Sequence, residues 1–115
     1  AMLRLQAEFP QATLFLIPLD LADLVSVRAF AQEFCTQFEQ LHILVNNAGI
    51  MGPPYQQTAI GAELQFGTNH LGHFALTGLL LAPITMAISR ATLGFSAIHT
   101  LNAFILSFLN LKNNS

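Results

Sequence analysis

Residues 41–49, LHILVNNAG, decide the fold expected for this chain. They begin with a short apolar run, which is typical of a strand that is buried on both faces, as in a parallel sheet. At Asn46 the run changes abruptly to two asparagines, an alanine and a glycine, so we expect the strand to end there. Because open α/β sheets bind their ligands beyond the carboxyl ends of the strands, this stretch also predicts one edge of a binding site.

The sequence before this strand predicts further alternating structure. Residues 1–9 are interpreted as the last turns of a helix, which Pro10 ends because proline cannot continue a helix. Residues 13–19, TLFLIPL, are predicted to form a strand at a sheet edge, since Pro18 cannot donate a ladder hydrogen bond.

Two helices are predicted to pack on the sheet. The first is capped by Asp23 or Ser26, runs to about residue 39 and carries one apolar stripe at helical spacing. The stripe consists of Val27, Phe30, Ala31, Phe34 and Phe38. A loop at residues 48–62 leads to the second helix at residues 63–81, which Pro83 is expected to stop. Its expected packing face consists of Leu64, Leu71, Phe74, Ala75 and Leu79.

The regular pattern stops near residue 83. Beyond it no clean helix or strand period is present, and Arg90 is the only charged residue between Glu63 and Lys112. Residues 1–82 are therefore predicted to form an α/β unit with two parallel strands and flanking helices, and residues 83–115 an irregular or helical apolar tail. Residues 91–109 have the length of a membrane span, but polar residues interrupt them, so no span is expected and membrane association is the alternative.

Composition narrows the class of protein. Hydrophobic residues make up 53% of the 115 residues and charged residues only 9%, with a net charge of −2. The four basic residues are scattered, so no nucleic-acid-binding patch is predicted. Cys35 is the only cysteine, which excludes an intrachain disulfide and indicates a reducing compartment, so a cytoplasmic location is expected. No signal peptide is expected, because Arg4, Gln6 and Glu8 interrupt the first residues.

Three motifs, in this order, resemble the short-chain dehydrogenase/reductase family. They are LDLADLVSVRAF at residues 19–30, LHILVNNAG at residues 41–49 and LQFGTNHLGHFALTGLLL at residues 64–81. NNAG followed by the N-x-x-G-x-F pattern of Asn69, Gly72 and Phe74 carries the resemblance. The sequence NHLGHF is most similar to the retinol-dehydrogenase-like and WW-domain oxidoreductase-like branch.

The resemblance implies a partial Rossmann-like, doubly wound fold and hydride transfer on a small hydrophobic alcohol or ketone, with NAD or NADP as cofactor. It also implies roles for six residues: Asp20 contacts the adenine, Leu21 adds a backbone contact, Asn47, Ala48 and Gly49 line the adenosine ribose, and Asn69 is the asparagine of the catalytic tetrad. In the family's sheet, strands 1 and 2 separate strands 3 and 4. The two strands predicted here would therefore have to pair directly or leave a gap.

Each of these roles has a simpler alternative. Asp20 can act only as a helix-capping carboxylate, and Asn46 with Asn47 can form only a turn. Asn69 can face solvent on its helix. His70 and His73 are spaced so that they could share a metal, but no cysteine or acidic residue lies close in sequence, so no metal site is predicted.

The sequence lacks three features that the family's reaction needs. The Gly-rich turn that holds the pyrophosphate would precede residue 1, and no substrate-binding serine after a fifth strand is recognised. No Tyr-x-x-x-Lys is present. Tyr55 is the only tyrosine, the residue four positions after it is Ala59, and the only lysine is Lys112. The first hypothesis is therefore a fragment or truncated oxidoreductase that is not competent as this chain. The second is a non-catalytic protein that binds a full-length relative, another partner or a second copy of itself through exposed apolar helix faces.

Overall fold

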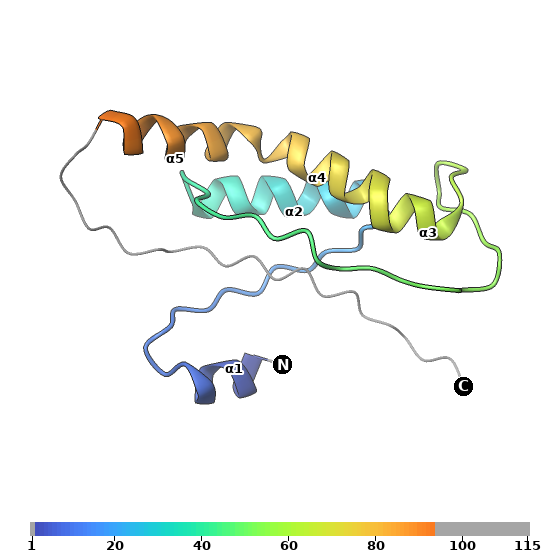
Figure 1. The fold of residues 1–115 in the computed structure, drawn as a ribbon, viewed down its shortest axis with the longest axis horizontal. Coiled ribbons are helices and arrows are strands. Elements are labelled where there is room, and N and C mark those ends of the chain that lie inside the picture. The colour runs from blue at the N-terminus through green and yellow to red at the C-terminus, as the bar shows by residue number, and fades with distance from the viewer. Residues whose placement is uncertain (1, 94–115) are drawn as a thin grey trace.

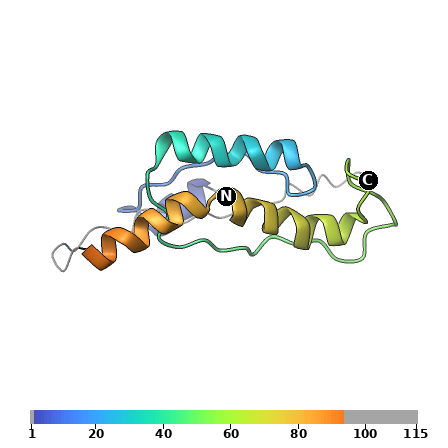
Figure 2. The same cartoon turned by 90° about the horizontal axis from the view of Figure 1, so that it is seen from above.

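The computed structural model describes residues 2–93, with side chains described for residues 2–87. The helical elements are α1 (Met2–Glu8), α2 (Leu24–Gln37), α3 (Leu64–Phe66), the π-helical turn η1 (Gly67–Gly72), α4 (His73–Leu79) and α5 (Leu81–Leu93). Figures 1 and 2 show α2 lying alongside the continuous α3–η1–α4 segment, with α5 extending beyond it. Helix α1 buries none of its residues. The described fold is therefore two packed helical rods rather than a sheet covered by helices. The first rod is α2, and the second is the α3–η1–α4 segment.

Helix α2 forms as the sequence predicts. Asp23 is its N-cap, and the carboxylate of Asp23 accepts a hydrogen bond of 2.8 Å from the Val25 N–H, which satisfies one of the free donors at the helix start. The predicted apolar stripe is confirmed, because its first four residues are buried and Phe38 is partly buried against them. This apolar stripe is thus the side of α2 that packs in the core.

The core forms where this stripe meets the second helical rod. Phe34 is 2% exposed, and it belongs to one cluster with Leu76 of α4 and with Leu80, which follows α4 directly. Leu21 and Leu41, from the segments that enter and leave α2, complete the cluster and are each 1% exposed. Burial of these side chains is the main favourable contribution to folding in this part of the chain.

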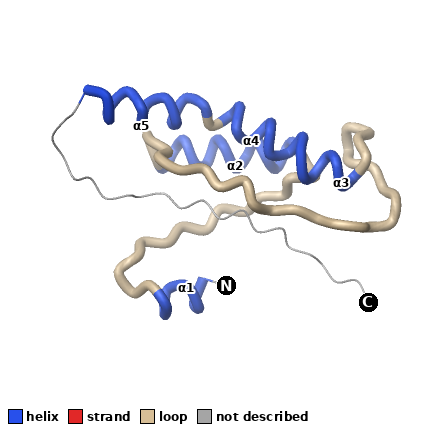
Figure 3. The backbone as a smooth tube through the Cα atoms, viewed as in Figure 1, coloured by secondary structure: helices blue, strands red, loops and turns tan. Residues whose placement is uncertain are grey.

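The two predicted parallel strands are not confirmed. Residues 13–19 and 41–45 are irregular chain, drawn as loop in Figure 3. No β-strand is formed within residues 2–93. Residues 41–45 are also not buried on both faces, because Ile43 and Val45 are each 38% exposed. The physical reason is that a strand is stabilised by a continuous ladder with its neighbours. Within the described residues these segments form no such ladder, and Val45 alone is in an isolated bridge. Direct pairing of the two segments is therefore not the arrangement adopted.

The predicted packing face of the second helix is wrong in part. Phe74 is 75% exposed and Leu79 is 43% exposed, although both were expected to face the core. The residues that are buried instead are Gly67, Thr68, Gly72, His73, Leu76 and Leu80. The π-helical turn changes the helical phase after Phe66, and the lack of a side chain at Gly72 lets this face approach its neighbour most closely.

The prediction that Pro83 stops the helix is wrong, because the chain bends near Pro83 and continues as a helix. Helix α4 ends at Leu79, α5 begins at Leu81, and the two parts are bent by 55°. Pro83 lies in the first turn of α5, where its missing N–H costs no helical hydrogen bond, while its ring would clash with the carbonyl four residues earlier in a straight helix. The predicted division between residues 82 and 83 is not tested by this geometry, and it stays a prediction.

No single described helix is long and apolar enough to cross a membrane. The bent pair Leu64–Leu79 and Leu81–Ala87 has the length and apolar composition of a membrane span only when its two parts are taken together. From residue 94 on, the stretch considered at residues 91–109 lies outside the described residues.

The start of α3 is predicted to depend on pH through Glu63. Its carboxylate accepts hydrogen bonds of 2.8 Å from the N–H groups of Gln65 and Phe66, and these bonds hold the pKa of Glu63 below its ordinary value of 4.5. Because the folded-state pKa is depressed, the cap stabilises the fold fully above pH 4.5 and is lost as the pH falls through the lower folded-state value. Amide exchange at Gln65 and Phe66 should therefore accelerate, relative to intrinsic exchange, on acidification.

The matched control for this prediction is Glu63→Gln. Glutamine keeps a carbonyl oxygen at the cap but does not titrate. The extra acceleration in acid should be absent from this variant. An equal acid response in both proteins would show that another group is responsible.

Candidate cofactor-binding site

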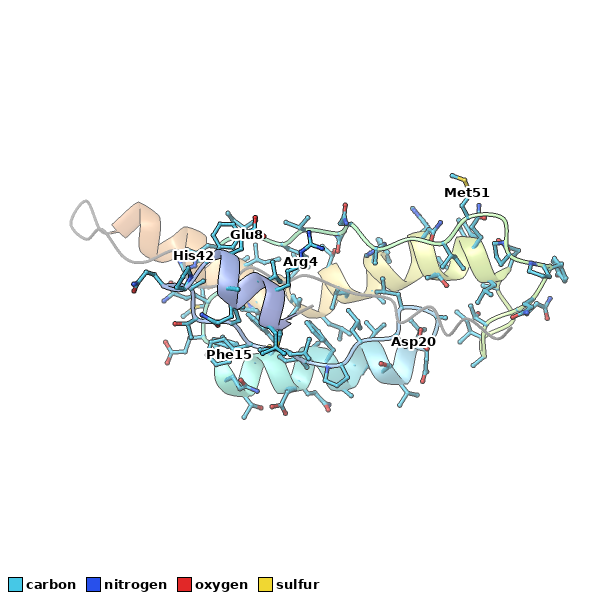
Figure 4. The ribbon with its side chains drawn as sticks, turned by 90° about the horizontal axis from the view of Figure 1, so that it is seen from below. Arg4, Glu8, Phe15, Asp20, His42 and Met51 are labelled. Atoms are coloured by element: carbon cyan, nitrogen blue, oxygen red, sulfur yellow. The ribbon has the colours of Figure 1, made fainter. Side chains whose placement is uncertain are left out.

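Asp20 and Leu21 lie where the chain turns into α2, and Figure 4 labels Asp20 at this end of the helix. The Asp20 carboxylate accepts a hydrogen bond of 2.9 Å from the Ala22 N–H, and the Asp20 N–H donates to the Ser26 hydroxyl at 2.9 Å. These bonds form a local turn, while Asp23 serves as the helix cap. Asp20 remains exposed at the surface, whereas Leu21 is buried. The alternative that Asp20 is the cap of α2 is therefore wrong.

The segment after the predicted strand is attached to the second helical rod at two points. The Asn46 side-chain amide donates to the Thr77 hydroxyl at 3.0 Å. The Asn69 side chain accepts from the Ile50 N–H at 2.9 Å and donates to the Ile50 carbonyl at 2.8 Å. Asn69 is exposed, as the simpler alternative predicts, but both polar ends of its side chain are bonded to the loop.

Residues 47–49 lie between these two attachments. Asn47 and Gly49 are exposed, and Ala48 is partly buried against the core. A Cβ atom placed on Gly49 would meet only the Asn69 amide, at 3.5 Å or more, which is an ordinary contact. The backbone of this short segment is thus accessible from the outside and is fixed at both ends. Small residues in such a place allow a ligand to approach the backbone closely.

One turn of helix brings the two predicted cofactor segments together. Gly72 packs so closely on Leu21 that a Cβ atom there would lie 2.3 Å from the Leu21 carbonyl oxygen. Three residues earlier, Asn69 contacts Ile50 and lies beside Gly49. The segment that contains Asp20 and the segment that contains residues 47–49 therefore both contact the turn from Asn69 to Gly72. The N-x-x-G spacing places Asn69 and Gly72 on one side of the helix, so the two segments that they contact lie close together.

The two histidines of this region do not share a site. His70 is exposed and stacks on Phe66 with ring centroids 5.2 Å apart, while His73 is buried and its Nδ1 lies 2.8 Å from the Asn69 carbonyl oxygen. Within the described residues, no three His, Cys, Asp or Glu side chains gather in a way that could hold a metal ion.

Two hollows on the surface lie away from these residues. One, of about 290 Å³, lies between α2 and α4, and one of about 400 Å³ lies between α2 and residues 16–18. Neither is lined by Asp20, Asn47 or Asn69. Asp20, Asn47 and Gly49 are exposed outside these two hollows, and their contact with a cofactor stays a prediction.

Several polar partners of the site were missed in the sequence. These are Ile50, His73 and Thr77, together with the close packing of Gly72. A signal was present, because Asn69, His73 and Thr77 repeat at every fourth residue and so lie on one face of the helix.

Comparison with known families assigns the class of protein. A family model described as short chain dehydrogenase matches residues 2–91, so the chain belongs to the short-chain dehydrogenase family. Membership implies a Rossmann-like fold, and this family generally uses NAD(P).

Individual relatives narrow the similarity. Mouse retinol dehydrogenase 11 is 44% identical over 94 residues, which cover 82% of this chain and 30% of that protein. Human retinol dehydrogenase 14 is 60% identical over 63 residues, or 55% of this chain and 19% of that protein. A crystal structure of an uncharacterized protein from Mycobacterium paratuberculosis is 56% identical, with a TM-score of 0.51, over 57% of this chain and 23% of that one. The chain thus spans less than a third of the length of these relatives.

Proposed function

We propose that this chain forms the adenosine-side wall of an NAD(P)-dependent oxidoreductase that acts on a small hydrophobic alcohol or carbonyl compound of the retinoid type. The observation that carries the proposal is the contact of Leu21 and of the Ile50 loop with one helical turn, from Asn69 to Gly72. The substrate class is inferred from the names of the retinol dehydrogenases to which the chain is similar.

Each proposed cofactor contact uses a group that is available in this fold. The exposed carboxylate of Asp20 would accept a hydrogen bond from the adenine amino group, beside a backbone group of Leu21. The accessible backbone of Asn47, Ala48 and Gly49 would lie along the adenosine ribose. When bound, the nicotinamide ring supplies the hydride donor or acceptor.

Asn69 is proposed to contribute to proton transfer through its position rather than by titrating. Its side chain is already engaged with both polar groups of the Ile50 backbone. The Asn69 amide therefore holds the loop, and its place in a π-helical turn is the kind of local distortion that recurs at functional sites.

We also propose that these 115 residues by themselves bind the adenosine part but do not transfer hydride. They contain no Tyr-x-x-x-Lys, which would supply the proton donor near neutral pH. The second candidate function is binding of another polypeptide through apolar side chains of α4 and α5. It is favoured by the exposure of Phe74, Leu79 and Leu81, which are 75%, 43% and 53% exposed.

A titration followed by backbone amide NMR shifts tests the proposal. We expect AMP and NADH to shift the same residues, Asp20, Leu21 and 47–49, while nicotinamide mononucleotide shifts none of them. Asp20→Asn should weaken AMP binding about tenfold, because it removes a charge-assisted hydrogen bond but keeps the oxygen that accepts from Ala22.

Glu33→Gln is the matched control, since it removes a carboxylate from the exposed side of α2 and should leave AMP binding unchanged. Absence of any nucleotide-dependent shift at residues 47–49 would contradict the proposed function and favour the polypeptide-binding alternative.

A further inference from the structure

His73 is a buried polar residue to which the resemblance assigns no role. It is 8% exposed and lies directly after the π-helical turn. Its Nδ1 atom is 2.8 Å from the Asn69 carbonyl oxygen. Because a carbonyl oxygen can only accept, this contact is a hydrogen bond when Nδ1 carries a proton. Nε2 finds no hydrogen-bond partner among the described residues, so the ring is held through Nδ1.

The backbone of the same residue has a second polar contact. The His73 carbonyl accepts a hydrogen bond of 2.8 Å from the Thr77 hydroxyl. That hydroxyl oxygen in turn accepts from the Asn46 side-chain amide at 3.0 Å. His73 therefore contacts both helix residues that hold the loop, Asn69 through its ring and Thr77 through its carbonyl.

The two attachments lie on opposite sides of residues 47–49. Asn46 is bonded to Thr77, and Ile50 is bonded to Asn69. Asn69, His73 and Thr77 follow at intervals of four residues, so they line up along one face of the helix. The result is a row of side chains whose ends reach the loop and whose middle member is His73.

We propose that His73 is a positioning residue, which fixes the turn that carries the Asn69 carbonyl and thereby aligns the Asn69 amide with the Ile50 backbone. Through this alignment His73 sets the place of residues 47–49 on the helix. The consequence for nucleotide binding rests on the proposed function, whereas the positioning itself does not.

The proposal makes a direct prediction about the unsubstituted protein. The ¹⁵N chemical shifts of the His73 ring should show a proton on Nδ1, because only a ring that carries this proton donates to the Asn69 carbonyl. A ring protonated only at Nε2 would overturn the proposal.

Amide exchange of Ile50 in two variants gives the second test. His73→Leu removes the donor but keeps an apolar side chain, so protection of the Ile50 N–H should fall about tenfold, the effect of losing a hydrogen bond. His73→Asn can place a side-chain N–H near the position of Nδ1, and it should keep Ile50 protection within about threefold of the parent. Equal loss in both variants, or no loss in His73→Leu, would overturn the proposal.

The Phe38 amide is the internal control for folding, because it donates to the Phe34 carbonyl at the far end of α2, at 2.8 Å. Loss of protection at Phe38 in His73→Leu would mean that this variant is unfolded as a whole. The proposal is then tested by the Nδ1 proton in the unsubstituted protein and by Ile50 protection in His73→Asn. Neither measurement uses nucleotide, so a failure to bind AMP leaves this test valid, and a failure here leaves the adenosine proposal to be judged by its own titration.

Discussion

Gly72→Ala lowers the free energy of unfolding by about 3 kcal/mol, the upper end of the cost of overpacking a core. The added Cβ atom would lie 2.3 Å from the Leu21 carbonyl oxygen and 2.9 Å from the Leu21 Cβ. The first of these is a backbone atom, so no side-chain rotation relieves the clash. The η1–α4 segment must move away from Leu21, which opens the core where α2 begins. Urea unfolding followed by circular dichroism measures the change.

Gly78→Ala, in the adjoining helix α4, is the control. A Cβ atom at Gly78 would meet nothing within 4 Å. Alanine is favoured over glycine in a helix interior, so this variant should gain about 0.5–1 kcal/mol. Equal destabilisation by both substitutions would mean that helix conformation, rather than contact with Leu21, limits position 72.

Phe34→Ala is expected to have the second large effect, a loss of about 3–5 kcal/mol. Phe34 is 2% exposed and belongs to the cluster that joins α2 to Leu76 and Leu80. Removing the ring leaves a cavity that the two helices cannot fill without moving together. Because the stability of a small domain is only about 5–15 kcal/mol, this variant should be largely unfolded under mild denaturing conditions. The midpoint of urea unfolding provides the measurement.

Phe74→Ala tests whether burial explains that loss. Phe74 is also a helical phenylalanine, but it is 75% exposed on α4. Its replacement should change the unfolding free energy by less than about 0.5 kcal/mol. A large loss at Phe74 with a small loss at Phe34 would show that the predicted packing face was right and that the rods pack differently.

Much of α2 could be predicted because its signals are local. Asp23 caps the helix through the amide two residues later, and Phe30 and Phe34 are one helical turn apart. Each of these relations is contained within a few adjacent residues. The assignment to the family also needed only the motifs around Asn47 and Asn69, which the match over residues 2–91 confirms.

The sequence could propose residues for the candidate site but not their contacts. The motifs pointed to Asn69 and to residues 47–49, and their proposed roles in cofactor binding and catalysis remain predictions. That Asn69 grips the backbone of Ile50, nineteen residues earlier, depends on how the loop returns to the helix. The same holds for Thr77, whose partner Asn46 is thirty-one residues away.

The sequence by itself determined the family and the position, cap and apolar stripe of α2, because these depend on neighbouring residues. Only the tertiary structure decided which face of α4 is buried, since the contact of Gly72 with Leu21 joins residues that are distant in the chain. It also decided that residues 13–19 and 41–45 remain irregular. A strand depends on hydrogen bonds to a neighbouring strand, and apolar composition alone does not provide them.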